Sequence, residues 1–500
     1  MTDHSLPDTA DTEAESQPTR RSVLAGAGAL AAARLAAAVG AGVLGAGRGM
    51  AATQRPNILF ILADDLGWGD VGYHGSDIRT PNIDKLAETG AKLEEFYVQP
   101  MCTPTRAAFM SGRYPFRYGL QTGVIPSGGT YGLPTDEFIL PQILKDAGYS
   151  TSIVGKWHLG HADKKFWPRQ RGFDYQYGPL IGEIDHFKHS SHGVVDWFRN
   201  NELVEEEGYD TELFAKDAIR IINEQDGKAP FFLYLAFTAP HSPYQAPQSY
   251  LDTYANISDP GRRAYASQIT AMDDQIGNVL AALEAKGLRE NTLIFFVSDN
   301  GGTRSKMFAG EAAVAGDLPP SNGKYREGKG TTYEGGTRVV ALANWPGHVK
   351  AGTVNEMMHV VDMLPTFTAL AGGSTDKTKP LDGKDVWKTV SQGAASPRDE
   401  IVYNIEPTGG AVRQGKLKLV WAAMLPQRVE LFDIDKDPYE SKNLAEQNPK
   451  AVAKLKARVE ALAAESQPPK FLMESLRLAL SIPPVLPGAT GGHIEGSDED

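Results

Sequence analysis

The sequence predicts an α/β fold, in which helices flank a large and mostly parallel sheet. A smaller C-terminal subdomain with an antiparallel sheet and a helix is expected to follow. Three observations support this prediction. Four apolar runs lack in/out alternation, as expected for strands that are buried on both faces. Helical patterns lie between these runs. After about residue 375 the chain changes to polar loops and shorter, alternating strands.

The four apolar runs are the clearest strand candidates. They lie at residues 56–65 (PNILFILADD), 148–160 (GYSTSIVGKWHLG), 229–243 (APFFLYLAFTAPHSP) and 291–302 (NTLIFFVSDNGG). Helices are predicted over residues 80–89, 138–147, 210–224 and 264–286. This alternation of strands and helices predicts a fold in which helices pack against a parallel sheet.

The C-terminal part is expected to form the smaller subdomain over residues 396–465, after a larger domain over residues 53–395. Its strands are predicted in EIVYNIEP, AVRQGKLKLVWAA and VELFDID, and its helix over residues 448–464. The tail, residues 466–500, is rich in Pro and Gly and ends in acidic residues. We therefore expect it to be extended or loosely ordered.

Residues 1–52 are predicted to be an export signal of the twin-arginine type. Arg20 and Arg21 precede a mildly apolar run of Ala, Gly, Leu and Val, which ends at the small residues GMAA. An uncleaved membrane anchor is the alternative, but Arg34 interrupts the run and its Ala and Gly residues give weak bilayer affinity. No cysteine directly follows the run, which excludes a lipid anchor. We expect a periplasmic or secreted bacterial protein, exported by the twin-arginine machinery, without stable membrane insertion.

Composition limits the partners that this chain can have. Its 500 residues suffice for a large core, and its formal charge of −12 argues against nucleic acid or an anionic membrane surface as the main partner. A local group of Lys, Arg and a metal ion could still hold an anionic substrate. With one cysteine the chain forms no intramolecular disulfide, so packing must provide its stability.

Chemically active side chains follow each of the four predicted strands. They are Asp64-Asp65, Lys156-Trp157-His158, His241 and Asp299-Asn300. In open parallel sheets, ligands bind beyond the carboxyl ends of the strands. Three carboxylates and an amide are hard oxygen donors, which suit Ca²⁺ or Mg²⁺ rather than zinc. Adjacent carboxylates also raise one another's pKa unless a cation lies between them.

Each of these groups has a plainer interpretation when taken alone. The first pair could be turn residues before a glycine, the last pair could be an ordinary tight turn, and His241 could be a structural loop histidine. Lys156 could be a solvated charge. Their occurrence together at four strand ends favours a metal-dependent site.

The only cysteine lies in PMCTPTRAAFMSGRYP. Pro104 is suited to the first position of a helix, which would continue over residues 105–112 with Arg106 in its first turn. The thiol of Cys102 would then lie at the amino end of that helix, where free N–H groups and the helix dipole favour anions. The alternative is a buried cysteine that acts as a small hydrophobic side chain.

The segment Cys102-Thr103-Pro104-Thr105-Arg106 resembles the Cys-x-Pro-x-Arg motif of the type I sulfatases, formylglycine-dependent enzymes of the alkaline phosphatase superfamily. Ser111 departs from that pattern, in which Thr is more usual. GYST and GKWH, within residues 148–158, fit the same family, and the resemblance extends from about residue 56 to 444. GEIDHFKHSSHGVVDWFRNNE, residues 182–202, is most similar to the arylsulfatase branch that includes N-acetylgalactosamine-4-sulfatase. The resemblance implies an alkaline-phosphatase-like sandwich, with residues 53–395 as the catalytic domain.

The resemblance also implies a chemistry for the lone cysteine. A formylglycine-generating enzyme would read the motif in the unfolded chain and oxidise Cys102 before export. In the resulting aldehyde hydrate, one hydroxyl would attack sulfur, and deprotonation of the other would later expel sulfate. One divalent cation, Ca²⁺ in preference to Mg²⁺, is expected beside it.

Residue roles follow from matching the motifs of that family. The implied metal ligands are Asp64, Asp65, Cys102, Asp299 and Asn300. The implied catalytic residues are Cys102, Arg106, Lys156, His158, His241, Asp299 and Lys329. Arg106 and Lys156 would stabilise the hydrate, whereas Asp299 and His158 would accept its protons. The pair His241 and Lys329 would bind sulfate and protonate the leaving alcohol, although Lys324 lies close to Lys329 in the sequence.

The function expected from these residues is hydrolysis of sulfate esters, with aryl sulfates as assay substrates and glycan sulfates as a natural candidate. A phosphate or phosphonate ester hydrolase on the same scaffold is an alternative, but such enzymes bind two metals through additional His and Asp ligands. A non-catalytic binder of sulfated glycans is another, but it would not need the cysteine, the arginine or the histidines. The loops at residues 179–201 and 303–326 are expected to contact the substrate.

Overall fold

The computed structural model describes residues 55–308, 317–424 and 426–480. All of them lie in the second of the two units into which the chain divides, Thr53–Asp500. The predicted export signal, residues 1–52, lies outside the described residues, as do residues 481–500 of the predicted tail. Within the described ranges, no helix has both the length and the apolar character needed to cross a membrane.

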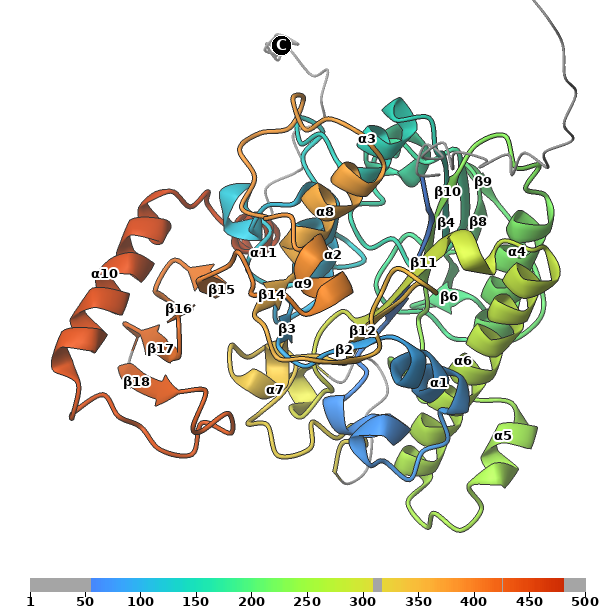
Figure 1. Ribbon diagram of the computed structural model, residues 1–500. Helices are drawn as coiled ribbons and strands as arrows, with labels where there is room; N and C mark the ends of the chain where they lie inside the picture. Colours follow the sequence, from blue (N-terminus) through green and yellow to red (C-terminus); the bar gives the residue numbers. More distant parts are fainter. Residues whose placement is uncertain (1–54, 309–316, 425, 481–500) are drawn as a thin grey trace, which may run out of the picture. The chain divides into compact units, whose positions relative to one another are not determined.

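The largest sheet has ten strands in the order β13-β2-β12-β11-β1-β10-β4-β5-β8-β9 (Figure 1). Its strands are β1 (Asn57–Ala63), β2 (Ala91–Leu93), β4 (Ser150–Gly155), β5 (Tyr175–Gly178), β8 (Phe198–Arg199), β9 (Glu202–Leu203), β10 (Phe231–Ala236), β11 (Thr292–Ser298), β12 (Ala341–Asn344) and β13 (Gly352–Val354). The five strands β11, β1, β10, β4 and β5 run parallel, whereas β12 and β8 are antiparallel to their neighbours. The four predicted strands are the four central ones.

Strand β1 shows why its sequence is a continuous apolar run. Successive side chains of a strand point to opposite faces of the sheet. Ile58, Phe60 and Leu62 enter one hydrophobic core, while Leu59 and Ile61 enter the core on the other side. Both faces of the strand are therefore buried, as the sequence predicts.

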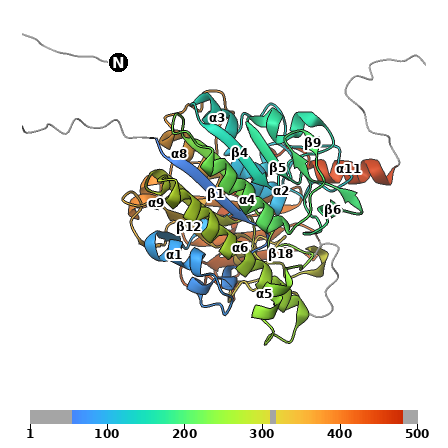
Figure 2. The same cartoon turned by 90° about the vertical axis from the view of Figure 1, so that its right-hand side faces the viewer.

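Helices cover both faces of this sheet, and Figure 2 shows α4 and α6 lying across one of them. The core on that face includes side chains from α1 (Pro81–Thr89), α4 (Asp210–Asn223) and α6 (Pro260–Ala285). The core on the opposite face includes side chains from α2 (Cys102–Ser111), α3 (Leu140–Asp146) and α8 (Met363–Leu370). Shorter helices are α5 (Gln248–Thr253), α7 (Glu334–Thr337) and α9 (Trp387–Gln392). The predicted layering is confirmed.

Helix α6 begins four residues before its predicted start. The Asp259 side chain accepts a hydrogen bond from the backbone N–H of Arg262, and Pro260 occupies the first helical position. An acidic N-cap residue followed by proline marks the start of a helix, and a prediction based on apolar periodicity alone misses this signal.

The predicted C-terminal antiparallel sheet with its helix is also confirmed. It contains β15 (Glu400–Glu406), β16 (Gly409–Gln414), β17 (Leu417–Ala422) and β18 (Arg428–Asp433), and α10 (Pro449–Ala464) contacts it. The stretch AVRQGKLKLVWAA, expected as one strand, is a hairpin that turns at Gly415. Two small ribbons complete the strands, β3 (Phe96–Tyr97) with β14 (Met358–His359) and β6 (Ser190–Ser191) with β7 (Val194–Val195).

Part of the segment expected to be an extended tail is helical. Helix α11 (Lys470–Ala479) follows Pro469, and the backbone N–H of Lys470 donates to the carbonyl of Gly119 at 2.8 Å. A carboxylate oxygen of Glu474 accepts hydrogen bonds from the backbone N–H of Thr130 at 3.2 Å and from its hydroxyl at 3.1 Å. The prediction of an extended tail was based on the Pro and Gly content of the whole segment, so it missed this short amphipathic helix. The helix contacts the loop at residues 119–130.

Candidate active site

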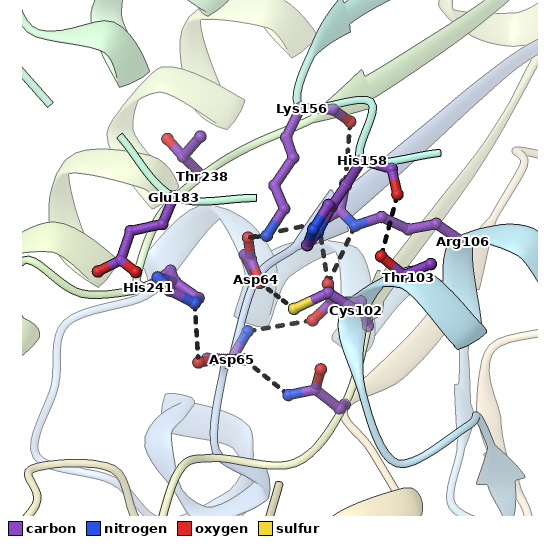
Figure 3. Close-up of polar contacts among 12 residues, drawn as sticks. Asp64, Asp65, Cys102, Thr103, Arg106, Lys156, His158, Glu183, Thr238 and His241 are labelled. Atoms are coloured by element: carbon purple, nitrogen blue, oxygen red, sulfur yellow. Dashed lines mark hydrogen bonds and ion pairs between the residues drawn. The ribbon is translucent and has the colours of Figure 1, made fainter. Parts of the chain in front are cut away.

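Every strand-end residue predicted from the sequence is buried, and Figure 3 shows five of them close together, namely Asp64, Asp65, Lys156, His158 and His241. Asp64 and Asp65 follow β1, Lys156 follows β4, and Asp299 follows β11. Since these parallel strands end at the same edge, side chains more than 200 positions apart in sequence come into contact. Asn300, His158, His241 and Lys329 are buried in the same region.

Asp64 is surrounded by the groups expected to hold a reactive hydrate. Its carboxylate accepts a hydrogen bond from the Lys156 ammonium, and the Cys102 Sγ lies 3.2 Å from its Oδ1. The Arg106 guanidinium lies 3.5 Å from Asp64 and 2.9 Å from Asp299. Burial alone would raise the pKa of Asp64, but Lys156 and His241 lower it well below its ordinary value.

Asp65 organises the other side of the site. Its carboxylate accepts hydrogen bonds from Lys329 Nζ at 2.8 Å, from Asn300 Nδ2 at 2.7 Å and from the Thr303 hydroxyl at 2.9 Å. Although burial opposes it, Asp65 raises the pKa of Lys329 well above its ordinary value. The alternative lysine, Lys324, is exposed and lies over the Tyr439 ring, so Lys329 is the lysine of this site.

The backbone at the ends of β1 and β4 has unusual conformations. Asp65 has φ of 66° and His158 has φ of 57°, values that residues other than glycine seldom adopt. Such conformations cluster at functional sites, where the surrounding structure holds them in place. Here they aim two polar side chains back toward the sheet edge.

Cys102 is the first residue of α2 rather than a residue that precedes it. The helix begins two residues before Pro104, which occupies its third position, where a missing N–H still costs nothing. The thiol therefore lies at the helix amino end, as predicted. Burial, followed by the charges of Asp299 and Asp64, raises the pKa of the Cys102 thiol well above its ordinary value. An unmodified Cys102 is thus a neutral thiol and not a reactive thiolate.

The His158 ring presents a bare nitrogen at this site. Its Nε2 lies 3.0 Å from the carbonyl oxygen of Ile125, which can only accept, so Nε2 carries the hydrogen. Nδ1 is buried and has no hydrogen-bond partner among the described residues. Burial, with Lys156 and Arg106 nearby, lowers the pKa of His158 well below its ordinary value. A Cβ at Gly182 would lie 2.2 Å from the ring, so only glycine leaves room for His158.

His241 is linked to Lys329 by a hydrogen bond of 3.2 Å to its Nε2. Its Nδ1 lies 2.6 Å from the carbonyl oxygen of Ser242 and therefore carries the hydrogen, so Nε2 accepts from the lysine ammonium. Burial and Lys329 lower the pKa of His241. Its backbone carbonyl in turn accepts a hydrogen bond of 3.1 Å from His186 Nε2.

The residues at this edge fit a divalent cation. Asp64, Asp65, Cys102 and His241 each offer a ligand atom, and these four atoms lie within 4.8 Å of one another. Asn300 Oδ1 is a buried acceptor without a hydrogen-bond partner among the described residues. Burial and the charge of Asp64 raise the pKa of Asp299 to about 7, the expected result when carboxylates are crowded together. Carboxylate and amide oxygens are the ligands preferred by Ca²⁺ and Mg²⁺.

A cavity of about 560 Å³ leads from Cys102, His158, His241 and Lys329 toward the surface. The two loops predicted to contact substrate both line it, through residues such as Glu183 and Met307. Sequence reasoning missed two other parts of its wall, the loop at residues 122–127 and Phe471 from α11. It also missed Thr303 and the Ile125 carbonyl, because backbone groups and common hydroxyls give no signal in a single sequence. Glu183 lies within the stretch 182–202 that carries the resemblance, which could have marked it.

Comparison with known proteins identifies the family. The family model named Sulfatase matches residues 56–374, and a model named N-sulphoglucosamine sulphohydrolase, C-terminal, matches residues 328–465. The chain belongs to the sulfatase family, whose members hydrolyse sulfate esters. This confirms the type I sulfatase resemblance. It does not test the proposed relation to the N-acetylgalactosamine-4-sulfatase branch.

Individual relatives support this assignment. Arylsulfatase J of Mus musculus is 42% identical over 384 residues, which cover 75% of this chain and 62% of that protein, so the chain spans less than two thirds of its length. N-acetylgalactosamine-6-sulfatase of Homo sapiens is 37% identical over 374 residues, or 70% of this chain and 69% of that protein. The crystal structure of Ps i-CgsB in complex with k-i-k-neocarrahexaose is 33% identical, with a TM-score of 0.76, and the match covers 86% of this chain and 98% of that chain.

Proposed function

We propose that this protein hydrolyses sulfate esters at a formylglycine derived from Cys102 and beside one divalent cation. The observation that carries the proposal is the meeting of Cys102 with carboxylates and cationic side chains at one buried edge of the sheet, next to a cavity. The carboxylates are Asp64, Asp65 and Asp299, and the cationic side chains are Arg106, Lys156 and Lys329. An anionic ester entering the cavity would meet Lys329 at its wall, while Arg106 and Lys156 lie fully buried against the carboxylates beside residue 102, where electrostatic attraction is strong.

The two absent groups would supply the central chemistry. A formylglycine hydrate offers one hydroxyl as a nucleophile and a second for release of sulfate, which explains why a family enzyme keeps this cysteine. A cation held by Asp64, Asp65, Asp299, Asn300 and residue 102 would polarise sulfate oxygens. The donor set of oxygens supports Ca²⁺ first and Mg²⁺ second.

The side chains of this protein have roles that their contacts support. Asp299, whose charge acts on the side chain of residue 102, would accept a proton from a hydroxyl there. His158 would accept the proton of the second hydroxyl, since its bare Nδ1 is a neutral base. Lys156 and Arg106 would hold the hydrate against the carboxylates.

Sulfate binding and leaving-group protonation are assigned to His241 and Lys329. The Lys329 ammonium already donates to His241 Nε2, so a proton can reach the leaving alcohol through this pair. Both residues line the cavity together with Cys102, which supports a role for them beside the bond to be cleaved.

Maturation and export belong to the same proposal. The signal over residues 1–52 supports folded export by the twin-arginine machinery to the periplasm or the medium. The Cys-x-Pro-x-Arg segment supports earlier modification by a formylglycine-generating enzyme. For the substrate, the names of the relatives support two classes, aryl sulfates and glycan sulfates.

One experiment tests the proposal directly. Mass spectrometry of the peptide that contains residue 102 is combined with turnover of 4-nitrophenyl sulfate and 4-nitrophenyl phosphate by the same preparation. We expect formylglycine and a strong preference for the sulfate. An unmodified thiol in fully active enzyme would contradict the mechanism, and preference for the phosphate would favour a phosphate ester hydrolase. Binding of sulfated glycans without turnover of either ester would favour a non-catalytic binder.

A further inference from the structure

The outer wall of the cavity contains a residue from the C-terminal helix α11. Phe471 lines the same cavity as Cys102, although α11 follows the ends of both matched family models, which lie at residues 374 and 465. Its ring packs over Gly123, where a Cβ would lie 3.0 Å from the ring carbons. Gly123 also has φ of 72°, so both its conformation and its neighbour require glycine.

The position of Phe471 is fixed by contacts on both sides of it along the chain. Before it, the backbone N–H groups of Gln467 and Lys470 donate to the carbonyls of Phe116 and Gly119, each at 2.8 Å. After it, buried Glu474 accepts hydrogen bonds from Thr130. These contacts hold the aromatic ring at the cavity wall, where a bound molecule can pack against it.

Near that wall the cavity is mainly apolar. Val124, Ile125 and Pro126 line it from one loop and Ile181 from another. A surface of this kind, with the rings of Phe471 and Phe308 also lining the cavity, fits a flat molecule or a sugar with an apolar face.

Among the residues that the structure describes, Glu183 is the only carboxylate that lines the cavity. It is half-buried beside His241, and the Ser242 hydroxyl lies 3.4 Å from its Oε1 (Figure 3). No arginine lines the cavity, and Lys329 is the only lysine that does, among the described residues. His192 is the further titratable side chain of the described wall, so a second anionic group on the substrate would meet a carboxylate there and neither an arginine nor a second lysine.

We propose that the alcohol half of the ester is uncharged and has an apolar ring face, which packs on Phe471 while Glu183 excludes anionic groups and accepts hydrogen bonds from hydroxyls. This inference rests on the proposed function and narrows its substrate class. Phe471 and Glu183 are thus specificity-determining residues supplied by α11 and by the loop at residues 179–201.

The first test uses Phe471→Ala, with Leu472→Ala as its matched control, because Leu472 is the next residue on α11 and is 46% exposed. KM for 4-nitrophenyl sulfate and the inhibition constant of inorganic sulfate are measured for each. Phe471→Ala should raise KM about tenfold, the usual effect of removing an apolar pocket contact. The sulfate inhibition constant should stay within about twofold, because sulfate binds only at the catalytic end. Phe471→Leu, which keeps packing on Gly123, should give an intermediate KM.

The second test compares 4-carbamoylphenyl sulfate with 4-carboxyphenyl sulfate, which differ in charge but hardly in size. Wild-type enzyme should prefer the neutral ester, and Glu183→Gln should reduce that preference about tenfold, the order of a close like-charge contact. Glu202→Gln is the matched control, since Glu202 is an exposed carboxylate of the same chain region. Turnover of D-galactose 6-sulfate, with the same dependence on Phe471, would identify the ring as a sugar, and its absence would identify an aromatic alcohol.

The outcomes separate this inference from the function on which it rests. If wild-type enzyme carries formylglycine and cleaves 4-nitrophenyl sulfate, but neither Phe471→Ala nor Glu183→Gln changes the measured ratios, the inference is wrong and the function stands. If wild-type enzyme cleaves no sulfate ester, both are wrong. An equal KM increase in Leu472→Ala would also overturn the role of Phe471, because it would reflect a general effect of changing α11.

Discussion

Two clusters of buried charge lie on this chain, and they differ in how completely their members are paired. We call the first the active-site cluster, and it contains Asp64, Asp65, Arg106, Lys156, His158, Asp299, Asn300 and Lys329. We call the second the Glu334 cluster, and it contains Tyr97, Glu334, Tyr403, Arg413, Lys418 and Glu440. All of these side chains are buried in the structure.

The Glu334 cluster joins α7 to the C-terminal sheet. One oxygen of Glu334 accepts from the Tyr97 hydroxyl at 2.8 Å, and the other accepts from Tyr403 at 3.0 Å and Lys418 at 2.9 Å. Lys418 also forms an ion pair of 2.8 Å with Glu440 Oε1, an atom that has no hydrogen-bond partner among the described residues. Burial alone would raise the pKa of Glu334, but Lys418 leads the charges that lower it to about 2.

The active-site cluster is equally buried but incompletely satisfied. Asn300 Oδ1 and His158 Nδ1 lack partners among the described residues. This cluster also adjoins the cavity. The comparison teaches that burial of charge alone does not identify a functional site. Unpartnered polar atoms next to a cavity favour ligand binding, whereas an ion-paired cluster that lines no part of this cavity specifies packing.

The largest effect should come from removing the nucleophile precursor. Cys102→Ala should lower turnover of 4-nitrophenyl sulfate by about 10⁴-fold or more, as expected when a nucleophile is lost. Its unfolding free energy should change little in comparison, because a small side chain replaces a neutral thiol. Steady-state kinetics and urea unfolding of one preparation would check both statements. Substantial remaining turnover would mean that residue 102 is not the reacting group.

His241→Ala should reduce turnover less than Cys102→Ala does. Loss of a general acid typically costs about 10²–10⁴-fold, and Lys329 would remain to bind sulfate. The measurement is kcat for two aryl sulfates with good and poor leaving groups. The loss should be greater for the poor leaving group, which needs protonation more. An equal loss for both esters would remove the general-acid role.

A substitution in the Glu334 cluster should lower stability and leave turnover almost unchanged. Lys418→Met would leave Glu334 and Glu440 buried without their shared ammonium, so it should lower the free energy of unfolding by about 3–5 kcal/mol. Turnover per folded molecule should stay near the wild-type value. Urea unfolding would measure the free energy of unfolding, and kcat per folded molecule would measure turnover. As a control, the exposed Lys416→Met should have little effect on either.

These clusters also explain what the sequence could and could not predict. Asp64, Lys156 and Asp299 each follow an apolar run, so local pattern and the rule for parallel sheets were enough to place them together. The Glu334 cluster joins residues from position 97 to position 440 across two sheets, and no local pattern marks Lys418 inside strand β17. Phe471 was missed for a similar reason, since its role depends on where α11 packs and not on the sequence around it.

A metal ion should stabilise the active-site cluster and not the Glu334 cluster. At a Ca²⁺ concentration about 100 times Kd, binding to the folded state alone adds about 2.7 kcal/mol to the free energy of unfolding. The measurement is the rise in melting temperature when Ca²⁺ is added back to enzyme that was dialysed against a chelator. Asp65→Asn should abolish most of this shift. Lys418→Met should melt at a lower temperature without Ca²⁺ but should show the same shift when Ca²⁺ is added. An equal shift in Asp65→Asn would place the cation elsewhere.

The smallest effect concerns the pH dependence of stability through Glu440. Burial, and then the charge of Glu334, raise the pKa of Glu440 to about 7 against the opposing effect of Lys418. The folded state therefore binds this proton more tightly than the unfolded state, in which a glutamate has a pKa of about 4.3. The contribution of Glu440 to stability is thus present below about pH 4 and decreases as pH rises toward 7. Glu440→Gln should flatten the unfolding free energy over that interval in urea titrations. An unchanged slope would show that Lys418 keeps Glu440 ionised, and the two clusters would then be alike in holding charged carboxylates.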